Sequence, residues 1–549
     1  MIGFPSESNR QSLLLLLSKT AVYVLLGIFL CLFAYCTFQR MMYPFEIDWL
    51  EGELICHAIW LMEGHQIYAP PSSQFISEIY PPFYYLLSAL FFKIFNTFNF
   101  LIPRVLSVFS LLGILCLLYL IALKEGGNKS VAIIISGFFL SFYEIHGPWY
   151  DVGRVDMLFF FMILSGLFVL AYSKNKLWGL CTGTVLLVLG CYTKQSGLYF
   201  LPFAALYLFL SDKRCGIAFA FLALGLVLGI FYVLNVLTDG WFATYTVLNP
   251  FRYNEILNKP ISELPFQLLF EMRDKLFPEI RYEIFFKLPI FFTLVLAFVV
   301  NRILTLQRTS KVTMWEVTTI PAVVSYFSIR PHLGSEKNDF MYLTLWGCML
   351  LGLLLIRLAK PALDSSRRSK RTTVYLLLAL QLTLNLYSPK SVVPAPGSAA
   401  KGAEFIAMVK NIPGPVYIPF HSFYGYLAGK EMIFNGGAYW AYQILSREIF
   451  RPDDLIEKLR NKYFYAIIID EKAYVTLKGE KTAIDNIKLL LTSGDEVSKT
   501  VEENYSLAKR ISYRSDDEFR NVTGFMTRPE LILEPRKISS STDRTEPTN

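Results

Sequence analysis

Long apolar runs separated by short polar linkers dominate the chain as far as about residue 388. A helix that crosses a membrane needs about 20 mostly apolar residues, and several of these runs reach that length. We therefore predict an α-helical polytopic membrane protein with about eleven transmembrane helices plus interfacial helices. The predicted transmembrane helices lie near residues 15–37, 103–123, 131–146, 156–172, 177–193, 197–211, 215–237, 287–301, 312–329, 340–358 and 373–388.

Five of the linkers between these runs are rich in lysine and arginine. Their acids are only Glu125, Asp212 and Asp364. Because lysine and arginine concentrate in the cytoplasmic loops of membrane proteins, we place all five linkers on the cytoplasmic side. They lie at residues 124–129, 174–176, 212–214, 302–311 and 357–371.

One further apolar segment, Phe83–Phe95, has only 13 residues and contains Lys93. As a transmembrane helix it would move the linker at 124–129 to the outside, whereas as an interfacial helix it keeps every basic linker inside. We therefore predict an interfacial helix here, an internal N-terminus and an external C-terminal region. The first run exceeds the apolar core of a signal peptide and is interpreted as a retained helix.

The composition agrees with a membrane protein. Hydrophobic residues make up 54% of the chain and charged residues only 17%, against roughly 25% in soluble domains. The cytoplasmic linkers explain the formal net charge of +8 better than a basic patch for a polyanion does. These values exclude a soluble enzyme, a disordered chain and a nucleic-acid-binding protein. The eight cysteines form no CxxC pair, so neither a disulfide framework nor a zinc site is predicted.

From residue 389 the pattern changes to a proline-rich linker followed by alternating helix-like and strand-like segments. This alternation predicts a small extracytoplasmic α/β domain over residues 389–535, after a transmembrane domain over 1–388. The polar end, 536–549, predicts a disordered tail. The expected helices cover 401–411 and 453–461, the expected strands cover 415–419 and 463–469, and residues 483–491 form an amphipathic segment. His421, Tyr424 and Asp470 are interpreted as core residues and not as a catalytic site.

Four carboxylates stand within eight residues just after the first apolar run, namely Glu46, Asp48, Glu51 and Glu53. Carboxylates buried beside a membrane without partners are costly. The cluster therefore indicates a site at the outer membrane surface, in which one acid acts as a general base and a neighbouring acid raises its pKa. The alternative is that the acids form a solvated helix N-terminus, because acids favour the first turn of a helix.

The motifs after this cluster are more specific. A predicted helix over 54–63 leads into Gly-His-Gln-Ile-Tyr at 64–68, and Tyr-Pro-Pro follows at 80–82. This order resembles the first outer loop of the GT-C glycosyltransferase superfamily, and is most similar to the branch of protein O-mannosyltransferases and lipid A aminoarabinose transferases. Glu46 and Asp48 match the acidic Glu-x-Asp motif of that loop. The Gly-x-x-x-Tyr spacing is one residue longer than usual, and the resemblance covers roughly residues 20–340.

Later outer loops extend the resemblance. Arg154 and Asp156 match an Arg-x-Asp at the mouth of a transmembrane helix, where the family would use them to shape an acidic pocket with Asp48 that orients a substrate or a metal. A structural ion pair is the alternative. Lys194 and Gln195 lie in a Thr-Lys-Gln-x-Gly motif, and a lysine here would neutralise a lipid-linked phosphate. Snorkelling of the lysine to the interface is the alternative.

Weaker candidates for contacts to the same substrate are Arg104 and His332, the latter in an Arg-Pro-His stretch. Asn338 lies in a stretch that resembles the family's Gly-x-x-x-Asn motif, and is placed near the substrate. Tyr80 and Trp149 are suited to stack on a sugar, although aromatic residues at an interface are also ordinary anchors.

The resemblance implies an integral-membrane glycosyltransferase of a cytoplasmic-type (cell inner) membrane, with its active site on the extracytoplasmic side. Its donor would be a polyprenyl-phosphate-linked sugar, its acceptor a hydroxyl of a lipid, glycan or protein, and the reaction would invert the anomeric carbon. Asp48 is the first candidate for the base and Glu46 the second. No cofactor is required, and the acidic pocket leaves room for a divalent metal.

Two alternatives belong to other functional classes. A lipid or sugar transporter or flippase would suit the number of helices, but such folds often show inverted repeats and charged residues at the midplane. Neither is evident in the sequence, and its charges crowd one face. A non-catalytic sugar-binding membrane protein would not need the carboxylate cluster beside the membrane.

Overall fold

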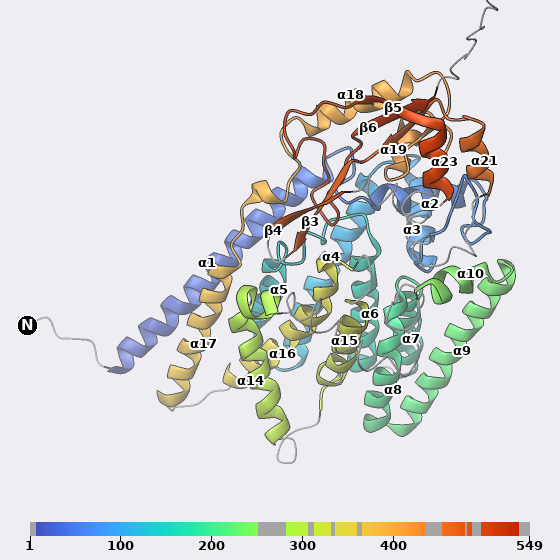
Figure 1. The fold of residues 1–549 in the computed structure, drawn as a ribbon. Coiled ribbons are helices and arrows are strands. Elements are labelled where there is room, and N and C mark those ends of the chain that lie inside the picture. Colours follow the sequence, from blue (N-terminus) through green and yellow to red (C-terminus); the bar gives the residue numbers. More distant parts are fainter. Residues whose placement is uncertain are drawn as a thin grey trace, which may run out of the picture.

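The computed structural model of the chain describes residues 7–174, 176–250, 281–305, 312–330, 335–359, 365–433, 453–477, 480–485 and 496–536. His332 and the predicted tail beyond residue 536 lie outside these described residues. Most of the chain is helical (Figure 1).

Each of the eleven predicted apolar runs contains helix. The bounds are α1 Glu7–Met41, α4 Leu101–Lys124, α5 Lys129–Ser141, α6 Val155–Tyr172, α7 Lys176–Cys191, η1 Gln195–Tyr199 with α8 Phe200–Ser211, α9 Lys213–Leu237, α14 Pro289–Thr305, α15 Met314–Ile329, α16 Met341–Ala359 and α17 Ser365–Leu384. The prediction of helices is therefore confirmed.

Not every helix is long enough to cross a membrane alone. Five helices in the described residues have the length and apolar composition for a crossing, and a sixth is formed if the pair Arg281–Lys287 and Pro289–Thr305, bent by 97°, counts as one span. Helices α5, α7 and the η1–α8 unit are apolar but shorter. The chain is thus an integral membrane protein, and the number of eleven crossings stays a prediction.

The helices differ in how deeply they are buried. The apolar span that ends in α16 is 94% buried within the molecule, whereas that of α9 is only 11% buried. Helix α16 therefore forms the centre of the bundle and α9 its edge, where apolar side chains face lipid. Helix α1 runs beside α17 along the opposite edge (Figure 1).

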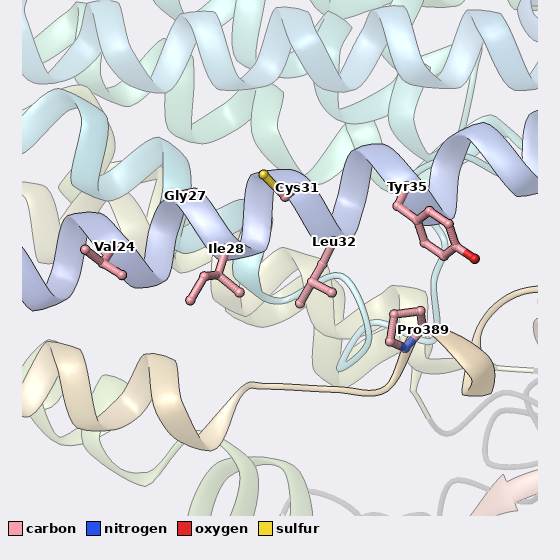
Figure 2. Close-up of a pocket in the computed structure, with 7 residues that line it drawn as sticks. All are labelled: Val24, Gly27, Ile28, Cys31, Leu32, Tyr35 and Pro389. Atoms are coloured by element: carbon pink, nitrogen blue, oxygen red, sulfur yellow. The ribbon is translucent and has the colours of Figure 1, made fainter.

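An open apolar groove runs along α1, next to the chain that leaves α17 (Figure 2). Almost no polar surface lines it, which suits a face that contacts the acyl chains of lipids. The lining residues are Val24, Gly27, Ile28, Cys31, Leu32, Tyr35 and Pro389.

Two helices lie between the bundle and the C-terminal region, α2 (Glu51–Met62) and α3 (Phe83–Phe95). A 13-residue helix is about 20 Å long, which is shorter than the roughly 30 Å apolar core of a bilayer. The large side chains that α3 exposes are Leu86, Leu90, Ile94 and Phe95. They recur at helical spacing, so α3 presents one apolar face, as predicted for an interfacial helix.

The C-terminal region lies on top of α2 and α3 (Figure 1). It contains a four-stranded sheet with strand order β1-β2-β6-β5, in which β1 and β2 are parallel and the other pairs antiparallel. The small α/β architecture is therefore as predicted. Its elements are α18 Ser398–Lys410, β1 Val416–Tyr417, α19 Ser422–Leu427, α21 Asp453–Arg460, β2 Ala466–Ile469, β3 Lys472–Leu477, β4 Glu480–Asp485, α23 Glu496–Asn504, β5 Tyr505–Arg510 and β6 Leu531–Pro535.

One detail of the predicted domain differs. The amphipathic segment expected over 483–491 begins inside β4, which pairs with β3 as a hairpin, and residues 486–491 lie outside the described residues. Alternating polar and apolar residues over so short a stretch fit a strand as well as a helix, so the sequence pattern alone does not distinguish them.

Candidate active site

The four carboxylates after α1 are all buried. Glu46 is 2% exposed, Asp48 and Glu51 are 0% exposed, and Glu53 is 3% exposed. The alternative of a solvated helix N-terminus is therefore wrong, because each carboxylate is covered by other parts of the chain. Each acid accordingly needs partners inside the protein.

Glu51 and Arg104 form the centre of this loop. The guanidinium of Arg104 donates two parallel hydrogen bonds to the Glu51 carboxylate, of 2.9 and 2.7 Å. Its remaining donors bind the carbonyls of Arg40, Tyr43 and Phe45. Arg104, a predicted substrate contact, is thus fully engaged in holding the loop at the end of α1.

A second buried pair, which sequence reasoning missed, joins Arg40 at the end of α1 to Asp151 in the loop between α5 and α6. The Arg40 Nε lies 2.9 Å from Asp151 Oδ2, and both side chains are inaccessible to solvent. Arg40 also donates to the carbonyl of Val392 and to the hydroxyl of Thr523. The pair therefore ties the first helix to both the loop between α5 and α6 and the C-terminal region.

Asp48 meets Arg154 inside the site. The Nη1 of Arg154 donates to Asp48 Oδ2 over 2.7 Å, and its Nη2 donates to the hydroxyl of Tyr80 over 2.9 Å. The guanidinium also stacks over the ring of Trp149, 4.9 Å from its centroid. Burial raises the pKa of Asp48 to about 6, although the charge of Arg154 acts in the opposite direction.

The two oxygens of Asp48 have different surroundings. Oδ2 accepts from Arg154 and from the backbone of Leu50, whereas Oδ1 is buried and has no hydrogen-bond partner within the described chain. Gly524 lies close to Oδ1, because a Cβ added at Gly524 would stand 2.8 Å from it. Oδ1 is therefore the atom of Asp48 that is left to accept a proton.

Asp156, at the start of α6, has separate partners. Its Oδ1 accepts from Lys194 Nζ at 2.9 Å and from Asn338 Nδ2 at 3.0 Å. Asp339 lies 3.7 Å from the same lysine nitrogen. Arg154 thus pairs with Asp48, and Lys194 with Asp156, so the direct Arg154–Asp156 ion pair considered as an alternative does not form.

The remaining predicted contacts have the following places. Gln195, next to Lys194, donates to the backbone carbonyls of Ile79 and Thr246. The carbonyl of Tyr80 accepts from Tyr68, the last residue of the Gly-x-x-x-Tyr motif. His332 lies outside the described residues. The structure brings together Asp48, Arg154, Tyr80 and Trp149 in one group, and Asp156, Lys194 and Asn338 in another.

Within the described chain, Glu46 is hydrogen-bonded to the C-terminal region, not to Arg154 or Lys194. Its Oε2 is hydrogen-bonded to Nδ1 of His421, whose Nε2 lies 3.1 Å from Oδ2 of Asp470. The backbone N–H of Glu46 donates to the hydroxyl of Tyr424. The interpretation of these three residues as ordinary core was incomplete, because their polar atoms hold the acidic loop.

Sequence reasoning also missed two acids of the site. Burial raises the pKa of Glu336 to about 8, and the negative charge of Asp48 adds to the shift. Burial likewise raises the pKa of Glu78, whose carboxyl is hydrogen-bonded to that of Glu53. Two carboxyls that share a hydrogen bond hold a proton between them. A signal for Glu336 was available, since it lies two residues before Asn338.

The described residues offer no ready set of ligands for a divalent metal. No group of three histidine, cysteine, aspartate or glutamate side chains suited to a metal ion occurs among the described residues. The two aspartates nearest the pocket, Asp48 and Asp156, each face a cation of the chain itself. No catalytic step is therefore assigned to a metal.

The chain is similar to known proteins in structure but not in sequence. No protein-family model and no curated protein sequence matches the chain. The oligosaccharyltransferase AglB from Archaeoglobus fulgidus, in complex with an inhibitory peptide and a dolichol-phosphate, is similar with a TM-score of 0.51 and 12% identity. The match covers 91% of this chain and 80% of AglB.

ArnT from Cupriavidus metallidurans bound to undecaprenyl phosphate is similar with a TM-score of 0.48 and 13% identity, over 93% of this chain and 97% of ArnT. The chain therefore has the same fold as AglB over 91% of its length.

Proposed function

We propose that the protein transfers a sugar from a polyprenyl-phosphate carrier to an acceptor hydroxyl on the outer side of the membrane. The observation that carries the proposal is Asp48, a buried carboxylate with one oxygen fixed by Arg154 and the other without a partner in the described chain. A glycosyltransferase of this kind needs such a group, because its acceptor hydroxyl must lose a proton as it attacks.

In the proposed reaction, Asp48 Oδ1 takes the proton of the acceptor hydroxyl while the acceptor oxygen bonds to the anomeric carbon. The bond from that carbon to the phosphate oxygen breaks, and its electron pair leaves with the polyprenyl phosphate. Attack and departure occur on opposite faces of the carbon, so the configuration inverts. A pKa near 6 leaves Asp48 ionised at neutral pH, as a base must be.

Two cations are suited to the leaving phosphate. Arg154 lies just before α6 and Lys194 lies between α7 and η1, and the side chain of Lys194 retains a small exposed fraction of 11%. Phosphate gains negative charge as the sugar bond breaks, so a fixed cation stabilises the transition state more than the ground state. Asp156 accepts a hydrogen bond from the ammonium of Lys194 and another from the amide of Asn338, so Asn338 fixes the carboxylate that holds the ammonium in place.

The fold supports the donor class. The structure of AglB, which has the same fold, is of a complex with an inhibitory peptide and a dolichol-phosphate. The charged groups of the present site also gather in loops at the ends of helices, as the positions of Asp48, Arg154 and Lys194 show. A transporter would instead need charged groups near the middle of the membrane.

Mass spectrometry of surface glycans and glycolipids from a strain that lacks the gene tests the proposal. We expect one sugar to be absent from one class of glycan or lipid, and its polyprenyl-phosphate form to accumulate. Expression of the parent protein should restore the sugar. Identical glycan, glycolipid and carrier-lipid profiles in the two strains would contradict the proposal.

A further inference from the structure

The ring of His421 lies between two buried carboxylates. Its Nδ1 meets Glu46 and its Nε2 lies 3.1 Å from Asp470, and all three side chains are at most 2% exposed. A neutral imidazole has one N–H, whereas an imidazolium donates from both nitrogens. Two ionised carboxylates, one at each nitrogen, therefore require the protonated ring. Burial alone would lower the pKa of His421, but Asp470 and Glu46 together raise it to about 10.

The groups around Glu46, His421 and Asp470 do not compensate the positive charge of the imidazolium. Tyr424 stacks on the imidazole with ring centroids 5.1 Å apart. The next acids are already paired, because Glu51 is bound by Arg104, and Glu530 is bound by Arg520 and Arg528. The imidazolium is thus the cation that faces both Glu46 and Asp470.

Glu46 is two residues before Asp48, and the backbone between them is fixed on both sides. The N–H of Ile47 donates to Glu51, while its carbonyl accepts from the N–H groups of Val522 and Thr523. His421, Tyr424, Val522 and Thr523 all belong to the C-terminal region. The position of Asp48 thus depends on residues more than 370 positions away in the chain.

We propose that His421 is a positioning residue of the transfer reaction, which acts through Glu46 to hold Asp48 in its productive place and makes the C-terminal domain part of the catalytic unit. The inference rests on the proposed function. Without the imidazolium, Glu46 would be a buried carboxylate with no cation, so it would take up a proton or turn toward water. Displacement of a reacting group by about 1 Å costs on the order of 10²-fold in rate.

The experiment measures kcat and donor KM with a polyprenyl-phosphate sugar as the donor. It compares four detergent-solubilised full-length proteins: the parent, His421→Gln, Glu46→Gln and the double variant. We expect His421→Gln to lower kcat about 10- to 100-fold and to leave donor KM within about twofold, because the phosphate contacts come from the membrane part. Since both residues act through one hydrogen bond, Glu46→Gln should cost much less in the His421→Gln protein than in the parent.

A pH profile separates positioning from a merely structural role. The parent should lose activity at alkaline pH as His421 deprotonates near pH 10, and His421→Gln should lack that loss. Asp470→Asn keeps the imidazole but removes one of its carboxylates, so the alkaline loss should move to lower pH. This second variant keeps the test decisive if His421→Gln does not fold. His65→Gln, at an exposed imidazole stacked on Trp60, controls for the loss of a histidine.

The outcomes distinguish the two proposals. A parent protein that turns over no polyprenyl-phosphate sugar contradicts the proposed function itself. If the parent is active, three results would each overturn the role of His421 and leave the proposed function standing. These are an unchanged kcat in His421→Gln, fully additive effects in the double variant, and a loss of activity at alkaline pH that Asp470→Asn does not shift.

Discussion

Lys194 illustrates how one buried charge serves both the fold and the proposed chemistry. Its ammonium is 2.9 Å from Asp156 and 3.7 Å from Asp339, and the residue is 9% exposed. Removal of one partner from a buried ion pair costs about 3–5 kcal/mol, because the other charge stays behind uncompensated. A simple neutral substitution would therefore confound loss of folding with loss of function.

The first prediction separates these effects at Lys194. Lys194→Met should lower both thermal stability and donor turnover. The double variant Lys194→Met, Asp156→Asn should recover most of the stability, because no uncompensated Asp156 carboxylate remains, but not the turnover. Lys194→Arg should keep partial activity, since guanidinium also binds phosphate, though as a planar fork. Thermal-shift and single-turnover assays measure both properties, and full turnover in the stable double variant would exclude a role in phosphate binding.

The second prediction concerns the acid limb of activity. A base must be deprotonated to work, so kcat/KM should fall as the pH decreases below about 6, the pKa to which burial raises Asp48. Arg154→Gln removes the cation that lowers this pKa, so the limb should move to higher pH. Arg460→Gln, at an exposed ion pair with Glu496, is the matched control and should leave the limb in place. An acid limb that does not move in Arg154→Gln would argue against Asp48 as the titrating group.

The sequence predicted the reactive loops better than the pairs within them. Asp48, Arg154, Asp156, Lys194 and Asn338 stand in the motifs that carried the family resemblance, and the structure gathers them near one another. Which cation meets which carboxylate depends on the packing of helices far apart in the sequence. For the same reason the contact between Glu46 and His421, 375 positions apart, had no local signal.

At the scale of elements, a short stretch of the C-terminal region, Asn521–Phe525, lies over Asp48. Thr523 pairs with Asp48 as an isolated parallel bridge, and Phe525 meets Trp49 edge to face with ring centroids 6.2 Å apart. Gly524 adopts a positive φ of 64° and lies directly against Asp48 Oδ1.

The third prediction tests this close approach. Alanine at Gly524 would place a Cβ 2.8 Å from Asp48 Oδ1 at a positive φ, so it should lower kcat beyond the effect of backbone strain. Gly429→Ala is a matched control in the same domain, with a φ of 70° and open space around the glycine. Strain at positive φ costs about 1–2 kcal/mol in either variant. Equal losses of kcat in the two variants, at equal stability, would show that contact with Asp48 does not matter.

The elements themselves were largely predictable, because long apolar runs and basic linkers are local signals. All eleven predicted runs contain helix, and Phe83–Phe95 is a separate short helix. Short strands were less predictable: β1 has only two residues and β2 starts three residues later than expected. Such strands are fixed by their neighbours in the sheet and not by their own pattern.

At the scale of the whole molecule, the fourth prediction is the topology. Single cysteines introduced into a variant without native cysteines should react with a membrane-impermeant reagent from outside at Ser391 and Lys509, both exposed beyond α17. Cysteines at Lys129 and Lys213, exposed in basic linkers, should react only after the membrane is opened. Outside labelling at Lys129 would mean that α3 crosses the membrane and that the site lies on the other side.

The central claim is that Asp48 is the base of a transfer that releases polyprenyl phosphate. The most direct test uses the polyprenyl-phosphate sugar that the deletion strain accumulates as the donor. It measures the rate at which the purified parent and Asp48→Asn proteins release polyprenyl phosphate from this donor. Asparagine keeps the shape but accepts no proton, so release should fall on the order of 10²–10⁴-fold while donor binding and thermal stability persist. Release at the parent's rate by a well-folded Asp48→Asn protein would contradict the account.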